Sequence, residues 1–299
     1  GSDPTPGLVG VEPVGADRIR IFRRIAAETV AEEVPFAPWL LATRAEPWGA
    51  LHSRPHIEPL AGDHALRFLV TFPNWPAYLD AARAARDSGE RMFRLRSPAE
   101  HYLTLSGRTL FKGLTFAEVR RLQIDIETLG FDAKRPECEV IVVALRSGEV
   151  EELLVLDGAE ADLIERLNDA VHRFDPDVIE GHNLFNFDVP FLARRAERNG
   201  LGLPWGRDGS NVHMLPGRSR FKAGPLTMPY TPAFVRGRHV VDTYQQIQRY
   251  DIGGRLTSYG LKQAVGELGL TRSDREFVAG ERIAEVWRTD RDRLLRYAL

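Results

Sequence analysis

Two acidic side chains lie two positions apart in a segment that has the pattern of a β-strand. Residues 122–127 read Leu-Gln-Ile-Asp-Ile-Glu, so apolar and polar residues alternate, and Asp125 and Glu127 share one face. Their Cα atoms are then roughly 6.6 Å apart. Two carboxylates held at that spacing repel each other unless a cation lies between them, so the pair predicts a divalent metal site. The alternative is a polar face on a surface strand, because acid-x-acid triplets also occur at Glu137/Glu139, Asp175/Asp177 and Asp290/Asp292.

A third carboxylate, Asp188, follows a turn between an expected strand and an expected helix. Residues 181–190 read Gly-His-Asn-Leu-Phe-Asn-Phe-Asp-Val-Pro, which places Asp188 at the start of the helix. Free backbone N–H groups at that end favour a carboxylate. Asp188 is therefore either a helix N-cap or a further ligand, and the local sequence alone favours the N-cap.

Tyr297 stands near the end of the chain, in a stretch with a helical pattern. Next to Leu294 and Ala298 it is expected to be a core residue whose hydroxyl reaches the rim. A side chain four positions after Tyr297 would share its helix face, and that position falls after residue 299.

The composition limits the class of protein. The chain has 299 residues, a net charge of −2, a hydrophobic share of 43% and a charged share of 27%, as expected of a globular protein with a large core. We find no apolar run long enough to cross a bilayer and no leader segment, so no membrane association is expected. The single cysteine, Cys138, excludes a disulfide framework and a thiolate zinc site and fits a reducing cytoplasm.

The apolar patterns divide the chain into two expected domains, residues 1–117 and 118–299. The first contains short proline-punctuated pieces, with a strand at 66–72 and a helix at 77–86, and predicts a small α+β or β-rich module.

The second expected domain alternates strands with helices. Its expected strands span residues 119–127, 138–145, 151–156, 178–180 and 239–242. Its expected helices span about 163–174, 187–198, 257–268 (capped by Thr257) and 283–299 (interrupted near Thr289). Residues 202–238 read as a proline- and glycine-rich basic loop that includes Arg218. Its positive charge either guides a nucleic-acid strand or belongs to a solvated loop without such a role. This order predicts a mixed sheet flanked by helices, an α/β architecture.

Three of these segments together resemble the exonuclease motifs of family B DNA polymerases. They are residues 124–128 (Ile-Asp-Ile-Glu-Thr), Asn183-x-x-x-Phe187-Asp188, and Tyr297, with separations of 188 − 125 = 63 and 297 − 188 = 109 residues. Residues 255–261 are similar to the segment that the family places between its second and third motifs. The resemblance covers about residues 119–299 and extends more faintly to the first domain, which is similar to the polymerase N-terminal module. It implies a ribonuclease H-like fold.

The resemblance also implies a chemistry. Asp125, Glu127 and Asp188 would bind two Mg²⁺ or Mn²⁺ ions, and Tyr297 would orient the attacking water. The reaction would be 3′–5′ exonucleolytic hydrolysis of DNA that releases nucleoside 5′-monophosphates.

The same resemblance implies substrate contacts and partners. Thr128, Leu129, Asn183 and Phe187 would contact the terminal nucleotides, although core packing explains Leu129 and Phe187 equally well. The expected partner is DNA with a single-stranded or frayed 3′ end, with a polymerase domain following in the same protein. We expect a monomer in the cytoplasm, associated with the nucleoid of a bacterium or archaeon and engaged in DNA replication or repair.

Two departures from the family pattern bear on these expectations. His182 stands where the family often has an aromatic residue, and the aspartate of the third motif would follow residue 299, so the exonuclease domain is expected to be truncated. Two other hypotheses therefore stay open. One is a non-catalytic relative that binds single-stranded DNA, and the other is a ribonuclease of the same fold.

Overall fold

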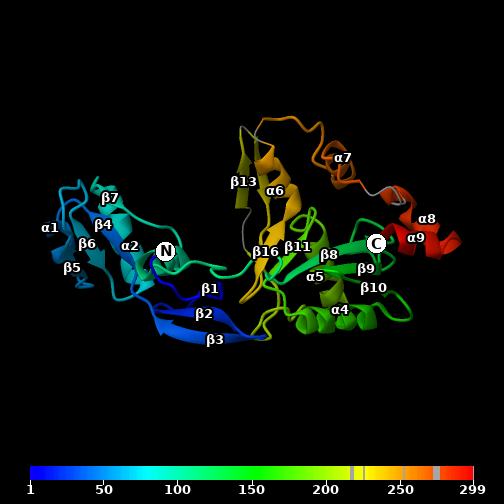
Figure 1. Ribbon diagram of the computed structural model, residues 1–299, viewed down its shortest axis with the longest axis horizontal. Helices are drawn as coiled ribbons and strands as arrows, with labels where there is room; N and C mark the ends of the chain where they lie inside the picture. The colour runs from blue at the N-terminus through cyan, green and yellow to red at the C-terminus, as the bar shows by residue number, and fades with distance from the viewer. Residues whose placement is uncertain (216–218, 225, 252, 272–276, 299) are drawn as a thin grey trace. The chain divides into compact units, whose positions relative to one another are not determined.

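The chain folds into two compact units, Gly1–Thr115 and Phe116–Leu299, in a computed structural model (Figure 1). The structure describes residues 1–215, 219–224, 226–251, 253–271 and 277–298. Arg218 of the expected basic loop and Leu299 of the expected last helix lie outside these ranges. Within the described ranges, no helix combines the length and hydropathy needed to span a membrane.

The first unit is rich in antiparallel β-structure. One sheet has the order β1 (Leu8–Val14), β2 (Arg18–Ile25), β3 (Glu28–Pro35), and the other has the order β5 (His56–Pro59), β6 (Phe68–Thr71), β4 (Trp39–Ala42), β7 (Met92–Phe93). Its helices are α1 (Glu46–Gly49), α2 (Trp75–Asp87) and α3 (Pro98–Ser106). The expected strand at 66–72 and helix at 77–86 are confirmed as β6 and α2. Helix α2 starts earlier because Asn74 caps it, accepting the Ala77 backbone N–H at 2.9 Å.

A mixed five-stranded sheet organises the second unit. Its order is β10 (Val150–Val155), β9 (Val140–Ser147), β8 (Arg121–Thr128), β11 (Val178–Gly181), β16 (His239–Asp242). The first three strands form an antiparallel meander, whereas β11 pairs in parallel with both β8 and β16. The predicted fold, a mixed sheet with flanking helices after a β-rich module, is confirmed.

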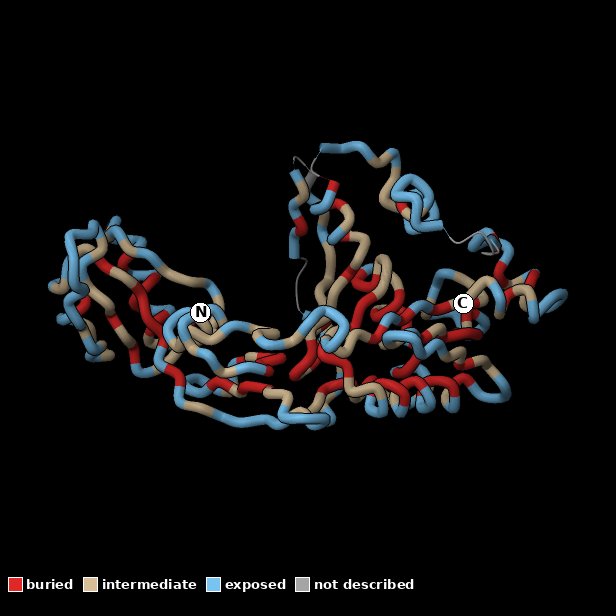
Figure 2. The backbone as a smooth tube through the Cα atoms, viewed as in Figure 1, coloured by how far each residue is buried: buried red, intermediate tan, exposed pale blue. Residues whose placement is uncertain are grey.

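Helices cover the sheet and bury its apolar side chains. Residues of β8 and β9 pack against α4 (Glu160–Phe174) and α5 (Asp188–Arg198) in one cluster. Ile141 and Val142 of β9 pack in a second cluster with residues of α8 (Ile283–Thr289) and α9 (Arg291–Ala298), which follow the short 3₁₀ helix η1 (Gly280–Arg282). Figure 2 shows buried residues along these strands and at intervals along the helices. The interruption expected near Thr289 is the break between α8 and α9.

The segment expected to be a loop, residues 202–238, contains short strands. β12 (His213–Met214) pairs with β15 (Ala233–Phe234), and β13 (Ser219–Ala223) pairs with β14 (Leu226–Tyr230), all antiparallel. Strands this short give little periodicity in the sequence, so pattern reading did not separate them from irregular chain.

The helix expected from Thr257 begins later than predicted. After α6 (Thr243–Tyr250), the next helix, α7, spans Leu261–Glu267 with Gly260 at its N-cap. Thr257 does not cap it, because its backbone N–H and its hydroxyl both bind the Glu267 carboxylate. The Leu256 backbone N–H binds Asp251, so both amides are held in a loop conformation.

Candidate active site

Strand β8 presents two of the motif acids at its C-terminal end. Leu122, Ile124 and Ile126 are buried, Asp125 is exposed and Glu127 is half-buried, so the predicted alternation along this strand is confirmed. The register with β11 covers Arg121–Gln123, and the acids lie beyond it along β8. The strand therefore carries both carboxylates past the edge of the parallel pair.

Helix α5 brings the third acid to this place. Asp188 is the first residue of α5, only 2% exposed, and Phe187 holds the N-cap position without a side-chain hydrogen bond. Because Phe187 and not Asp188 holds the N-cap position, the N-cap interpretation is wrong. The backbone N–H groups of Asp188 and Ile126 lower the pKa of the Asp188 carboxyl and the charge of Asp125 raises it, so this carboxyl lies beside β8.

The three carboxylates are electrostatically coupled. Burial, and after it the charges of Asp125 and Asp188, together raise the pKa of Glu127 to about 8 against the opposing effect of Lys262. Burial, and after it the charge of Asp125, likewise raise the pKa of Asp188 to about 8. Each acid thus interacts with the other two, and Glu127 and Asp188 hold protons at neutral pH.

This donor set suits a hard divalent cation, because carboxylate oxygens are its preferred ligands and a cation would relieve the mutual repulsion. The side chains are not, however, drawn together around a common point. Across the described part of the chain, no group of at least three His, Cys, Asp or Glu side chains has the arrangement needed to hold a metal ion. The residue types and charges therefore fit a divalent cation, whereas the side-chain positions do not form a coordination site.

Lys262 supplies positive charge next to the acids, and the sequence analysis missed it. It lies on α7, where its Nζ donates to the Val278 carbonyl at 2.8 Å. The same Nζ lies 5.2 Å from the ring centre of Tyr297 and 5.5 Å from that of Phe277, within cation–π range. Lys262 therefore interacts both with the Tyr297 ring and, through its charge, with Glu127, whose pKa it lowers.

Tyr297 itself is half-buried on α9 and packs against the cluster that contains Ile283, Val286 and Leu294. This is the core position that its helical neighbours predicted. Its assignment as the water-orienting residue stays a prediction.

The expected substrate contacts have different surroundings. Thr128 is buried and donates its hydroxyl to the Gly130 carbonyl at 2.7 Å, and Leu129 packs against the same cluster as Tyr297. Asn183 is half-buried, with a left-handed φ of +66°. The Phe187 ring lies 6.4 Å from that of Phe131, which is 68% exposed. Phe131 is thus an exposed aromatic residue beside Phe187.

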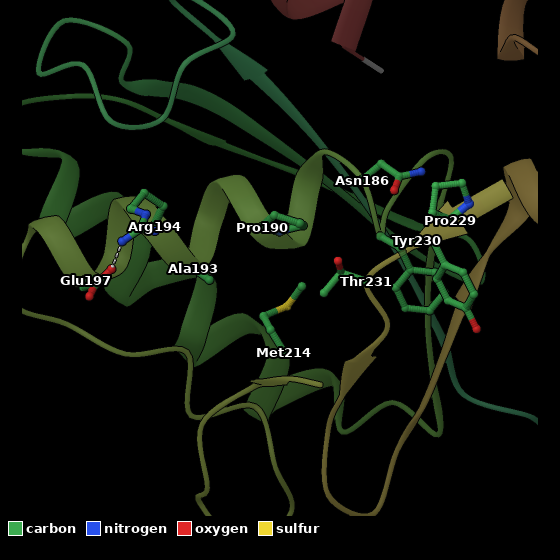
Figure 3. Close-up of a pocket in the computed structure, with 10 residues that line it drawn as sticks. Asn186, Pro190, Ala193, Arg194, Glu197, Met214, Pro229, Tyr230 and Thr231 are labelled. Carbon is green, nitrogen blue, oxygen red and sulfur yellow. Dashed lines mark hydrogen bonds and ion pairs between the residues drawn. The ribbon is translucent and has the colours of Figure 1, made fainter. Parts of the chain in front are cut away.

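A cavity of about 690 Å³ lies on the other side of α5 (Figure 3). It is lined by Pro190, Ala193 and Arg194 of the helix and by Met214 and Tyr230 across from it. Pro190 is two residues after Asp188 and hence roughly 200° further around the helix axis. The cavity is therefore separate from the face of α5 that presents Asp188.

Asp242 is a second residue that the sequence analysis did not select. It is the last residue of β16 and pairs with Gly181, the last residue of β11. It therefore lies at the end of the sheet from which the turn towards Asp188 starts. An acid that directly follows a parallel strand is a usable signal, because ligands bind outside the carboxyl ends of such strands. The signal was hidden, since the parallel pairing of β16 with β11 is not evident from local pattern.

Comparisons with known proteins identify the family. Residues 152–264 match the family described as "DNA polymerase family B, exonuclease domain", a stretch that includes Asp188 and begins after Asp125 and Glu127. The DNA polymerase of Archaeoglobus fulgidus is 30% identical over 190 residues, covering 62% of this chain and 22% of that protein. The DNA polymerase of Pyrococcus glycovorans is 30% identical over 217 residues, covering 67% of this chain and 25% of that protein.

A solved structure extends the similarity to both units. The family B DNA polymerase from the hyperthermophilic archaeon Pyrobaculum calidifontis matches 98% of this chain and 43% of its own, with a TM-score of 0.74 and 20% identity, which is a likeness of fold. The chain spans about a quarter of the curated relatives named above. It belongs to the family B DNA polymerases and corresponds to their N-terminal and exonuclease region.

Proposed function

We propose that the second unit is a metal-dependent 3′–5′ exodeoxyribonuclease of the proofreading type. The observation that supports the proposal is the electrostatic coupling of acids from β8 and α5: the charge of Asp125 raises the pKa of both Glu127 and Asp188. Placing carboxyl groups next to one another in a partly buried site costs folding free energy. Such arrangements are typical of functional sites. A cation held beside a phosphodiester is the use that fits acidic side chains of this kind.

Asp125, Glu127 and Asp188 would hold Mg²⁺ or Mn²⁺, in the two-ion arrangement expected for this family. When bound, these ions supply charge neutralisation at the scissile phosphate and a water of lowered pKa. The chain's own part is placement. Asp188 stands at the start of α5, beside β8, and Tyr297 would orient the attacking water from α9. The product would be a nucleoside 5′-monophosphate.

The proposed substrate is DNA with a single-stranded or frayed 3′ end. Thr128, Leu129, Asn183 and Phe187 would border the terminal nucleotides, and Phe131 adds an exposed ring beside Phe187 on which a base can stack. The whole protein would couple this activity to a polymerase domain in DNA replication or repair, and would act as a monomer at the nucleoid.

Metal binding is expected to depend on pH, because ligands must lose their protons first. Below the raised pKa of about 8 for Glu127 and Asp188, apparent Mn²⁺ affinity should rise up to about tenfold per pH unit for each proton displaced. The metal-free protein has the opposite trend: it binds more protons folded than unfolded. Its stability from these two groups is therefore full below their unfolded pKa values and is lost as pH rises to about 8.

Melting temperatures with and without Mn²⁺ at pH 6 and pH 8.5 measure both trends. The increase caused by Mn²⁺ should be clearly larger at pH 8.5. Asp188→Asn should reduce that difference, because one of the two proton-binding ligands is gone. An equal increase at both pH values would count against carboxylate ligands with raised pKa.

The experiment that tests the function is a degradation ladder. The native protein that contains this chain should be incubated, without nucleotides, with 5′-labelled single-stranded DNA and an RNA of the same sequence, across Mg²⁺ and Mn²⁺ titrations. Stepwise shortening of the DNA from its 3′ end is expected, with EDTA stopping it. Shortening of the RNA alone would identify a ribonuclease, and DNA binding without cleavage under both ions would identify a non-catalytic DNA-binding relative.

A further inference from the structure

The turn between β11 and α5 is held in a conformation that its own residues do not favour. Asn183 has φ = +66°, in the left-handed region that costs a non-glycine residue free energy, although asparagine tolerates it better than most. Helix α5 starts without a side-chain cap at Phe187. The turn determines where α5 begins, and so where Asp188 stands. It needs support from elsewhere in the fold.

Asp242, at the end of β16, provides that support. It is 1% exposed, and its carboxylate accepts three backbone N–H groups: Asn183 at 2.9 Å, Phe185 at 3.1 Å and Tyr244 at 2.9 Å. Two of these donors belong to the turn, and the third belongs to the first turn of α6. One buried carboxylate therefore ties the turn to the end of the neighbouring parallel strand and to the helix that follows it.

The next residue strengthens the same connection. The Thr243 hydroxyl donates to the Gly181 carbonyl at 3.1 Å, and it lies 3.2 Å from Nδ1 of His182. Nε2 of His182 lies 3.0 Å from the Tyr259 carbonyl oxygen. Because a carbonyl can only accept, Nε2 carries the proton and donates it to this bond. Residues 181–185 are thus attached to β16 and α6 along their length.

We propose that Asp242 is a positioning residue of the nuclease site, which fixes the turn at Asn183 and Phe185 and through it the place of Asp188. It holds the turn directly, because both of its oxygens accept backbone N–H groups. Its charge also raises the pKa of Asp188, and Thr243→Val, which leaves that charge in place, separates the two effects. The expected change in kcat rests on the proposed nuclease function. The expected change in amide hydrogen exchange does not.

The test replaces Asp242 by asparagine in the native protein. The amide keeps the size of the carboxylate but turns an –NH₂ group towards a backbone N–H donor, so at least one of the three bonds is lost. Hydrogen exchange at the Asn183 and Phe185 amides should become at least tenfold faster in Asp242→Asn. The kcat for DNA digestion should fall by about 10- to 100-fold with little change in KM, as for partners that orient metal ligands.

Asp177→Asn is the matched control. Asp177 is also fully buried, and it accepts the Arg120 backbone N–H at 3.0 Å and the Arg207 guanidinium at 2.9 Å, at the opposite end of β11. Its replacement should lower the melting temperature while leaving kcat and the exchange rates of Asn183 and Phe185 unchanged. If Asp242→Asn does not fold, Thr243→Val, which removes only the hydroxyl, should give the same pattern with a smaller loss of kcat.

Unchanged exchange at both amides in these variants would overturn the proposal, and so would an equal loss of kcat in Asp177→Asn. A wild-type protein that digests no nucleic acid would instead contradict the proposed function. The exchange measurement would then still decide whether Asp242 holds the turn.

Discussion

Asp188→Asn is expected to abolish DNA digestion and to make the metal-free protein more stable. The loss of activity follows from the role proposed for the carboxylate, because ion-assisted charge stabilisation contributes several kcal/mol to phosphoryl transfer. Each 1.36 kcal/mol is a factor of ten in rate, so a loss of at least about 10³-fold is expected. Asp125→Ala should cause a loss of the same order.

The gain in stability follows from the surroundings of Asp188. Burial and Asp125 raise the pKa of this carboxyl to about 8, so folding at neutral pH requires it to take up a proton that the unfolded chain does not hold. Asparagine has nearly the same size and needs no proton. A gain in stability together with a loss of activity is typical of a functional residue whose environment disfavours its charge.

Initial rates on 5′-labelled DNA, together with melting curves recorded in EDTA, measure both effects. Glu197→Gln is the control, since Glu197 is an exposed acid on the same helix, ion-paired with Arg194 at 2.6 Å. It should change neither quantity appreciably. Retention of more than about a tenth of the wild-type rate in Asp188→Asn would show that this acid does not take part in the chemistry.

The predictable part of the fold is the part in which one face of an element is buried. Strand β8 alternates buried and unburied residues, and α4 buries Leu163, Ile164 and Leu167 along one stripe, so the periods of 2 and 3.6 residues are readable in the sequence. The strand order β10-β9-β8-β11-β16 is a property of distant pairings. The resemblance predicted a ribonuclease H-like mixed sheet, and local pattern does not show which strands are neighbours in it.

The sequence selected the motif acids of the candidate site, and their roles stay predictions. Asp125, Glu127 and Asp188 are electrostatically coupled in the structure, whereas Lys262 and Asp242 were missed. Each of these two acts through a partner far away in sequence: Lys262 through Glu127 and Tyr297, Asp242 through Asn183 and Phe185. A lysine on a short helix and an aspartate after a strand look like ordinary surface residues until the strands are paired.

Arg195 is the clearest example of a residue whose environment depends on partners distant in sequence. On the predicted helix it reads as one more polar residue, yet it is 2% exposed and paired with Glu160, which is 4% exposed. Its guanidinium binds both Glu160 oxygens at 2.7–3.0 Å and also donates to the carbonyls of Arg135 and Pro136 at 2.7 and 3.2 Å. Burial of a charge is possible only with such a set of partners, and these partners lie 35 to 60 residues away.

Glu160→Ala is therefore expected to lower the free energy of unfolding by about 3–5 kcal/mol, because it leaves the buried Arg195 guanidinium without its counter-ion. The change also removes the acceptor for the Val140 backbone N–H, 2.8 Å away, and for the Asn199 amide. Equilibrium urea unfolding measures the effect. Glu197→Ala is the control, because its exposed pair with Arg194 on the same helix should contribute under about 1 kcal/mol.

The double variant Glu160→Met/Arg195→Met separates the buried charge from the rest of the network. If the uncompensated guanidinium causes the loss, removing it should restore a substantial part of the stability, since buried ion pairs are often replaceable by apolar side chains. Recovery should stay incomplete, because the carbonyls of Arg135 and Pro136 lose their donor. Those carbonyls lie in the segment that leaves β8 just after Glu127, so the double variant should also loosen the loop beside the acids. A double variant no more stable than Glu160→Ala would show that packing around these side chains, and not the buried charge, determines the loss.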